Sequence, residues 1–209
     1  MQFGPDFRAG LDHLFRWRRD VRRFRPDPVD PELIIRLLSQ AEMAPSVGLS
    51  QPWRWMLVES GAAQDAVRAN FTDANAKALQ TYSGSQRDTY ARLKLEGLDT
   101  APVHIAAFSD ETTLQGSGLG ASTMPEMRRY SVVCAITQLW LAARAEGLGI
   151  GWVSILDPDR LIRDLTVPDG WHFVAYLCLG FPAEDHVDPE LERAGWEHRR
   201  PASVPHLIR

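Results

Sequence analysis

Four short apolar stretches constrain the fold of this chain more than any other feature. They cover residues 53–59, 103–108, 147–156 and 173–179, and their lengths are those of buried strands. Longer segments with apolar residues at helical spacing predict helices over residues 5–18, 31–44, 62–79, 90–98 and 123–147, with a polar break at 81–86. Strands scattered between helices predict an α+β fold with helices packed around one sheet.

Length and composition predict a single domain over residues 1–209. A chain of 209 residues, with 44% hydrophobic and 24% charged residues, has enough apolar side chains for one substantial core. No stretch has the pattern of a signal peptide or a membrane span, so we expect a cytoplasmic protein. The formal net charge of −4 disfavours nucleic acid as a partner.

The cysteines and histidines lack the spacing of metal ligands. Cys134 and Cys178 have no CxxC or Cys-His neighbour and are predicted to be reduced residues of the core. The six histidines show no HExxH or similar pattern. We therefore expect no metal site.

An arginine cluster separates the first two predicted helices. Residues 16–25 contain six arginines and a single acid, Asp20. Guanidinium groups present a planar fork of donors that matches phosphate, so the cluster predicts a phosphorylated small molecule as ligand. A solvated charged face at a helix end is the alternative. Surrounding cations should hold Asp20 ionised, as either a poised acid and base beside the ligand or a local ion-pair partner.

Two other segments have residues suited to a ligand. The loop over residues 44–53 carries Ser46, Ser50 and Gln51, whose polar groups suit a ligand edge, although a plain connector has the same composition. The strand over residues 147–156 opens with glycines, which is costly unless another backbone or a flat ligand comes close. Ser154 follows Trp152 by one strand period and is expected on the same face.

Two predictions concern the middle of the chain. The segment over residues 110–122 is rich in glycine but does not match a dinucleotide-binding fingerprint, so we expect a mobile flap or a disordered connection. Thr123 and Glu126 have the spacing of a capping box for the long helix that follows.

Together, four stretches resemble the FMN-dependent nitroreductase superfamily over nearly the whole chain: the arginine cluster, the loop over residues 44–53, the glycine-opened strand and the C-terminal arginines. The resemblance implies a central mixed or antiparallel sheet surrounded by helices, a lid at about residues 82–98 and a C-terminal arm at about residues 185–209. It also implies a homodimer with two FMN sites at the subunit interface. The lack of a membrane span already argues against a membrane partner.

The same resemblance assigns residues to the flavin. The ribityl phosphate would be held by Arg18, Arg19, Arg22 and Arg199, with Arg200 as the alternative to Arg199. The remaining flavin contacts would be Asp20, Val21, Ser46, Trp152, Val153 and Ser154.

A closer resemblance is to a branch of the superfamily that consumes its flavin. The matching motifs cover residues 18–22, 46–53, 130–135 and 151–157. Ordinary members usually have serine in place of Asp20 and asparagine in place of Leu49. The implied reaction fragments reduced FMN, supplied by a separate flavin reductase, with dioxygen as co-substrate. Its products are dimethylbenzimidazole, the lower ligand of vitamin B12, and erythrose 4-phosphate.

Two residues would carry this chemistry. Asp20 would act as acid and base, and Ser154 would donate a hydrogen bond at the ring. Two alternatives stay open. One is an NAD(P)H-dependent nitroreductase in which FMN is a bound catalyst, and the other is a non-catalytic flavin carrier in which Asp20 is structural.

Overall fold

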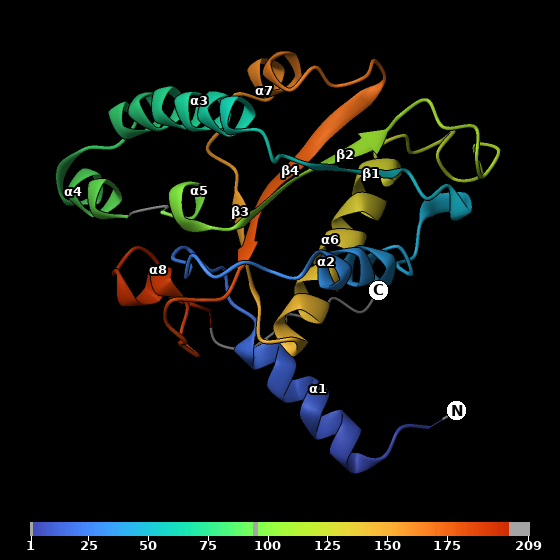
Figure 1. The fold of residues 1–209 in the computed structure, drawn as a ribbon, viewed down its shortest axis with the longest axis horizontal. Helices are drawn as coiled ribbons and strands as arrows, with labels where there is room; N and C mark the ends of the chain where they lie inside the picture. Colours follow the sequence, from blue (N-terminus) through green and yellow to red (C-terminus); the bar gives the residue numbers. More distant parts are fainter. Residues whose placement is uncertain (1, 94–95, 201–209) are drawn as a thin grey trace, which may run out of the picture.

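The computed structural model of the protein describes residues 2–93 and 96–200, which contain a four-stranded antiparallel sheet in the order β1-β2-β4-β3 (Figure 1). The strands are β1 (Trp53–Leu57), β2 (Val103–Asp110), β3 (Gly149–Val153) and β4 (Trp171–Gly180). Each overlaps an apolar stretch that predicts a strand, and the α+β fold class is confirmed. β3 lies at one edge of the sheet, beside the arginine cluster.

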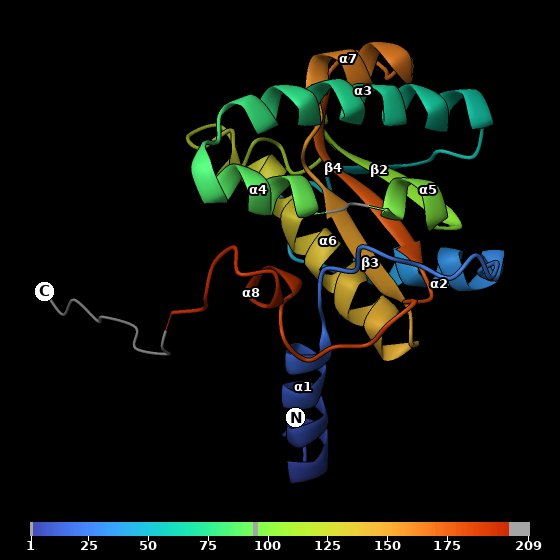
Figure 2. The same cartoon turned by 90° about the vertical axis from the view of Figure 1, so that its left-hand side faces the viewer.

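Helices cover both faces of the sheet (Figures 1 and 2). α2 (Pro31–Ala41) and α6 (Met127–Ala145) pack on one face. α3 (Gly61–Gln80), α5 (Gly97–Thr100) and α7 (Pro158–Asp164) pack on the other. The remaining elements are α1 (Pro5–Trp17), the 3₁₀ turn η1 (Val47–Leu49), α4 (Gly84–Arg92) and α8 (Glu190–Arg193). No helix within the described ranges is long and apolar enough to cross a membrane.

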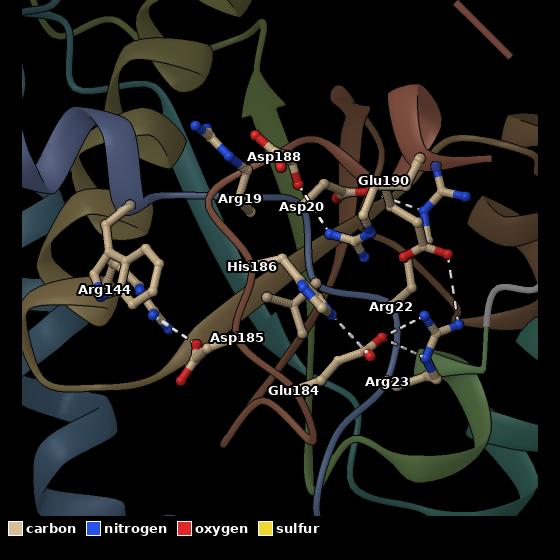
Figure 3. A pocket seen from close by; sticks show the side chains of 13 residues that line it. Arg19, Asp20, Arg22, Arg23, Arg144, Glu184, Asp185, His186, Asp188 and Glu190 are labelled. Carbon is tan, nitrogen blue, oxygen red and sulfur yellow. Dashed lines mark hydrogen bonds and ion pairs between the residues drawn. The ribbon is translucent and has the colours of Figure 1, made fainter. Parts of the chain in front are cut away.

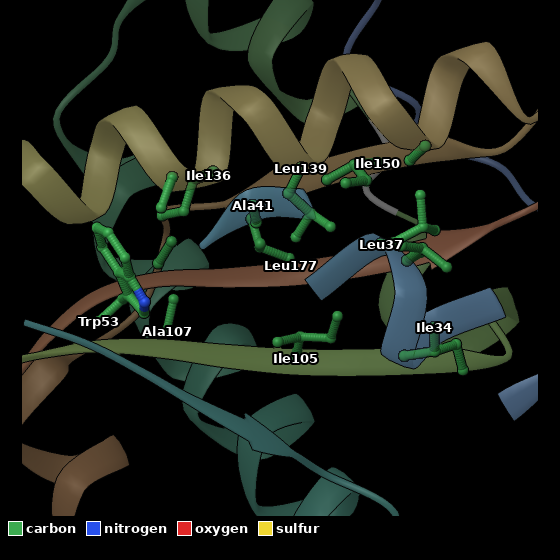
Figure 4. Close-up of a cluster of buried hydrophobic side chains, with 14 of the residues drawn as sticks. Ile34, Leu37, Ala41, Trp53, Ile105, Ala107, Ile136, Leu139, Ile150 and Leu177 are labelled. Atoms are coloured by element: carbon green, nitrogen blue, oxygen red, sulfur yellow. The ribbon is translucent and has the colours of Figure 1, made fainter. Parts of the chain in front are cut away.

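The sheet divides the core into two layers. Along β2, Ile105 and Ala107 belong to the layer beneath α2 and α6 (Figure 4), whereas Ala106 and Phe108 belong to the opposite layer. Successive side chains of a strand point to opposite faces, so a strand covered on both sides must be apolar at nearly every position. This explains why β2 is a nearly continuous apolar run in the sequence.

One predicted helix is misplaced. Residues 90–98 do not form one helix, because α4 ends at Arg92 and α5 begins at Gly97. α4 instead begins at Gly84, inside the predicted polar break. Tyr90 is the single buried residue of α4, so this surface helix has no apolar stripe from which its start can be predicted.

The segment before α6 also differs from expectation. Residues 111–126 form consecutive turns closed by backbone hydrogen bonds, which corrects the prediction of a disordered connection. The capping box is wrong as well. α6 begins at Met127 without a side-chain cap, and the Thr123 hydroxyl donates to the Gly120 carbonyl at 3.0 Å, because the turns continue up to the helix.

Two helices expose apolar side chains on the single chain. α1 projects away from the sheet in both views, none of its residues is buried, and Phe7 and Phe15 are exposed (Figures 1 and 2). α6 exposes Tyr130, Val133 and Cys134. The exposure of Cys134 corrects its assignment to the core. α6 is apolar around much of its circumference, so its pattern did not show which side faces the sheet.

Candidate functional site

The arginine cluster follows α1 and runs along the edge of β3. The Val21 N–H donates to the Ile150 carbonyl at 3.0 Å, and a parallel bridge joins Asp20 to Ile150. Asp20 adds a side-chain bond at the same edge, where its Oδ1 accepts from the Trp152 N–H at 2.9 Å. Edge strands carry unpaired backbone groups, and here the cluster pairs with some of them. Both backbone and Asp20 therefore fix the cluster to the sheet.

Gly151 provides the space for this crossing. A Cβ at Gly151 would lie 2.2 Å from the Val21 carbonyl oxygen, closer than any side chain tolerates. From the sequence, the glycines of this strand could be explained by the close approach of either another backbone or a flat ligand. At Gly151 the backbone of the arginine cluster fills the space.

The surroundings of Asp20 favour its protonated form. Burial raises the pKa of the Asp20 carboxyl above its usual value, although the Trp152 N–H and the Arg22 guanidinium act in the opposite direction. The Arg22 Nε lies 3.4 Å from Asp20 Oδ2, and the Arg22 side chain is 11% exposed while that of Asp20 is 37% exposed. Glu190 adds a small further rise. The arginines were expected to lower the pKa of Asp20, but its pKa is shifted upward, because burial outweighs the pairing with Arg22.

Acidic residues of the segment 184–190 bind part of the cluster (Figure 3). Arg23 pairs with Glu184, at 2.9 Å from Nε to Oε1, and with Glu190 at 3.5 Å. The Arg19 Nε donates to a backbone carbonyl of the same segment. Arg23 therefore joins the cluster to this segment through ion pairs, a pairing that the sequence did not predict.

Arg19 and three further arginines meet at a neighbouring cleft, which we call the anion cleft. It is lined by Arg18, Arg19, Asp20, Arg22, Pro189, Glu190, Leu191 and Arg199. The Arg18 guanidinium lies 4.8 Å from the centre of the Trp140 ring. Burial lowers the pKa of both Arg18 and Arg19, and the positive charge of Arg199 lowers both further. An anion in this cleft would relieve the repulsion between these cations.

Three predicted flavin contacts lie on β3 or just after it. Trp152 is half-buried and packs at 6.3 Å from Trp140, measured between ring centres. Val153 is buried, and Ser154 is exposed as the first residue after the strand. Ser154 does not line the anion cleft. Val21 lines the space beside the segment 184–190.

Ser46 lies apart from the anion cleft within one chain. Its Oγ accepts from the Gln51 N–H at 3.1 Å, and the Val47 N–H donates to the Ser131 Oγ near the start of α6. Trp140, which contacts the arginine cluster, is nine residues further along α6, a rise of about 13 Å. The single chain therefore does not bring Ser46 and Asp20 into one cleft.

Sequence reasoning missed several residues of this site. Trp140 supports the cluster from α6, since its Nε1 donates to the Arg19 carbonyl at 3.2 Å. It gave no signal because it was indistinguishable from the apolar core residues of that helix. Glu184 and Glu190 could have been found, because four acids within residues 184–190 complement the charge of the arginine cluster.

Fold and site thus define an α+β protein with a cation-rich cleft that also contains the acids Asp20 and Glu190. The model of the Nitroreductase family matches residues 15–181. A protein named 5,6-dimethylbenzimidazole synthase from Rhodospirillum rubrum is 59% identical over 202 residues, covering 97% of this chain and 96% of that protein. A protein of the same name from Rhodobacter capsulatus is 48% identical over 201 residues, covering 96% and 97%.

A solved structure has the same fold. It is an iodotyrosine deiodinase bound to FMN and 3-iodo-L-tyrosine, with a TM-score of 0.77 and 23% identity, covering 95% of this chain and 99% of that one. The chain belongs to the nitroreductase family. The resemblance stated from sequence is confirmed at the level of family and fold.

Proposed function

We propose that this chain has the activity of a 5,6-dimethylbenzimidazole synthase, which fragments reduced FMN with dioxygen. Dimethylbenzimidazole and erythrose 4-phosphate are released, and the pyrimidine part of the flavin ring leaves as a separate product. The observation that carries the proposal is Asp20, a carboxyl group that the Trp152 N–H holds on the wall of an arginine-lined cleft. The relatives at 59% and 48% identity have the corresponding name. Since FMN is consumed, a separate flavin reductase has to supply it in reduced form.

The anion cleft has the donors that the phosphate of FMN requires. Guanidinium forks bind phosphate oxygens in pairs, and the cleft offers those of Arg18, Arg19, Arg22 and Arg199. The Trp140 ring behind Arg18 limits the directions in which that guanidinium can point. In this proposal the arginines anchor the phosphate end of the substrate.

Asp20 is the residue proposed to move protons. Its Oδ1 is fixed by the Trp152 N–H, so its Oδ2 is the oxygen that gives and accepts the proton. A carboxyl group with a raised pKa retains its proton closer to neutral pH, where a general acid and base works best. Bound FMN supplies the ring that is oxidised and broken. Ser154, directly after β3, is proposed to donate a hydrogen bond that orients the reacting part of the ring.

A second copy of the chain completes the site in this proposal. Ser46 and Asp20 lie apart within one chain, and a homodimer with FMN at the interface would bring Ser46 of one copy to the flavin of the other. The exposed apolar residues of α1 and α6 offer a surface for such a partner. Residues 82–98 are proposed as the lid and residues 185–209 as the C-terminal arm, of which residues 94–95 and 201–209 lie outside the described ranges.

The test is an aerobic incubation of the purified protein with chemically reduced FMN, followed by chromatography and mass analysis. We expect dimethylbenzimidazole in an amount that depends on dioxygen, and loss of product in Asp20→Asn with FMN binding retained. Intact FMN together with oxidation of NAD(P)H by the protein alone would instead identify a nitroreductase. Intact FMN without either reaction would identify a flavin carrier.

A further inference from the structure

Two tyrosines from the middle of the chain and a tryptophan from its C-terminal segment form an aromatic cluster. Tyr82 and Tyr90 lie 4.7 Å apart between ring centres, just before and within α4. Trp196, from the C-terminal segment, meets Tyr82 edge-on at 5.3 Å and Tyr90 at 6.0 Å. The Tyr90 hydroxyl donates to Asn75 Oδ1 at 2.8 Å, which fixes this ring to α3. Trp196 therefore packs against the segment proposed as the lid, at the point where the Tyr90 hydroxyl ties that segment to α3.

Apart from Trp196, the described part of the C-terminal segment makes few apolar contacts with the rest of the domain. α8 is a single turn and buries none of its residues. Gly195, with a φ of +70°, ends that turn, and the Trp196 N–H donates back to the Leu191 carbonyl at 2.9 Å. The Arg199 N–H donates to Glu192 Oε1 at 2.5 Å, which folds residues 192–199 back on themselves. The local fold of this segment is thus internally bonded, and Trp196 is its aromatic contact with the domain.

Arg199 lies at a cleft where its positive charge is repelled by those of neighbouring arginines. It lines the anion cleft together with Arg18 and Arg19, and its charge acts against theirs. Without an anion, these like charges repel one another. An aromatic contact does not depend on charge, so it can keep Arg199 at the cleft before a ligand arrives. Such preorganisation reduces the entropy lost on binding.

We propose that Trp196 is the positioning residue for Arg199, and that its packing against Tyr82 and Tyr90 holds the C-terminal cation at the anion cleft. This inference rests on the proposed function in one respect, namely that the cleft binds the phosphate of FMN. Trp196 acts through Arg199 and makes no contact with the flavin ring in this proposal.

The test compares binding of oxidised FMN and riboflavin, which differ only in the phosphate group. We expect Trp196→Ala to weaken FMN binding about tenfold, as the loss of one charged contact does, and to change riboflavin binding by less than about twofold. Trp196→Phe should restore most of the FMN affinity, because a ring is retained. Arg199→Ala should reproduce the loss, and the Trp196→Ala, Arg199→Ala double variant should lose no more than either single variant. Arg36→Ala, an exposed arginine on α2, is the matched charge control and should leave both affinities unchanged.

Three results would overturn the inference. They are unchanged FMN affinity in Trp196→Ala, equal losses for FMN and riboflavin, and additive losses in the double variant. Circular dichroism of each variant shows whether a loss of FMN affinity comes from unfolding. If Trp196→Ala is unfolded, the FMN affinity of Trp196→Phe decides the question. Product formation is measured separately in the wild type. Absence of dimethylbenzimidazole together with a clear preference for FMN over riboflavin would reject the proposed function and leave this inference standing.

Discussion

The Asp20 Oδ1 accepts a hydrogen bond from the Trp152 N–H at 2.9 Å, at the edge of β3. A carboxylate thus takes the place that the carbonyl of a neighbouring strand would occupy. The bond fixes one carboxylate oxygen to the sheet and leaves the other beside Arg22 and the anion cleft. The residue proposed to move protons is therefore oriented by the backbone, independently of any ligand.

We predict that Asp20→Asn is more stable than the wild type at neutral pH. The pKa of Asp20 is raised in the folded state, so the folded protein binds the proton more tightly than the unfolded chain. Stability of the wild type then falls as pH rises from the unfolded value, 3.8, through the folded value. Asparagine carries no charge and escapes this loss, while its side-chain oxygen can still accept from Trp152. Thermal melts between pH 3.5 and 8 measure the difference.

The gain in melting temperature should be present at pH 7 and shrink toward pH 3.5. Asp12→Asn, on an exposed part of α1, is the matched control and should show no such trend. A variant less stable than the wild type at every pH would mean that the Asp20 charge stabilises the fold. Product formation by Asp20→Asn should fall at least about 100-fold, because the variant lacks the group proposed to transfer protons.

Arg22→Gln is predicted to move the pH dependence of product formation upward. Arg22 is the cation that pairs with Asp20, and it lowers the pKa of that carboxyl. Removing the positive charge leaves burial less opposed, so the pKa of Asp20 rises further. Rates at saturating reduced FMN, measured from pH 5 to 9, separate this effect from weaker phosphate binding. A pH profile of product formation that is unchanged or shifts to lower pH in Arg22→Gln would contradict the proposed effect of Arg22 on the pKa of Asp20.

The fold was predictable where local pattern and burial agree. Each strand overlaps an apolar stretch, and α2 begins where its sequence carries a cap, since Asp30 accepts from the Glu32 N–H at 2.9 Å. α4 was not predictable because it is a polar helix with one buried residue. The capping box failed because tertiary turns engage the Thr123 hydroxyl before α6 begins.

The site was predictable in its residue types but not in its electrostatics. Arg18, Arg22 and Asp20 come together because they are close in sequence, and Arg199 joins them from the other end of the chain. The upward shift of the Asp20 pKa depends on burial at the edge of β3, which no spacing of charges reveals. The use of Arg23 as an ion-pair partner depends on the path of residues 184–190, which sequence pattern does not show.

Gly151→Ala is predicted to detach the arginine cluster from β3. The added Cβ would lie 2.2 Å from the Val21 carbonyl oxygen, so the segment has to move and its bond from the Val21 N–H to Ile150 is strained or lost. We expect a loss of about 2–3 kcal/mol in the free energy of unfolding and weaker FMN binding. Gly10→Ala in α1 has no neighbour within 4 Å and should instead stabilise by about 0.5–1 kcal/mol. Equal effects of the two variants in urea titrations would show that the crowding at Gly151 is unimportant.

Asn70→Asp is predicted to disturb the loop that carries Ser154. Asn70 is 1% exposed on α3, and its amide bonds both backbone groups of Asp157, donating to the carbonyl at 2.9 Å and accepting from the N–H at 2.8 Å. Aspartate cannot donate the first bond and brings a buried charge, so we expect a loss of about 2–3 kcal/mol in unfolding free energy. Product formation should fall more than FMN affinity, because Ser154 lies in the tethered loop and the phosphate arginines do not. Asn75→Asp on the same helix keeps its role as acceptor for the Tyr90 hydroxyl and serves as the control. Parallel losses of product formation and FMN affinity in Asn70→Asp would indicate a general loss of structure instead.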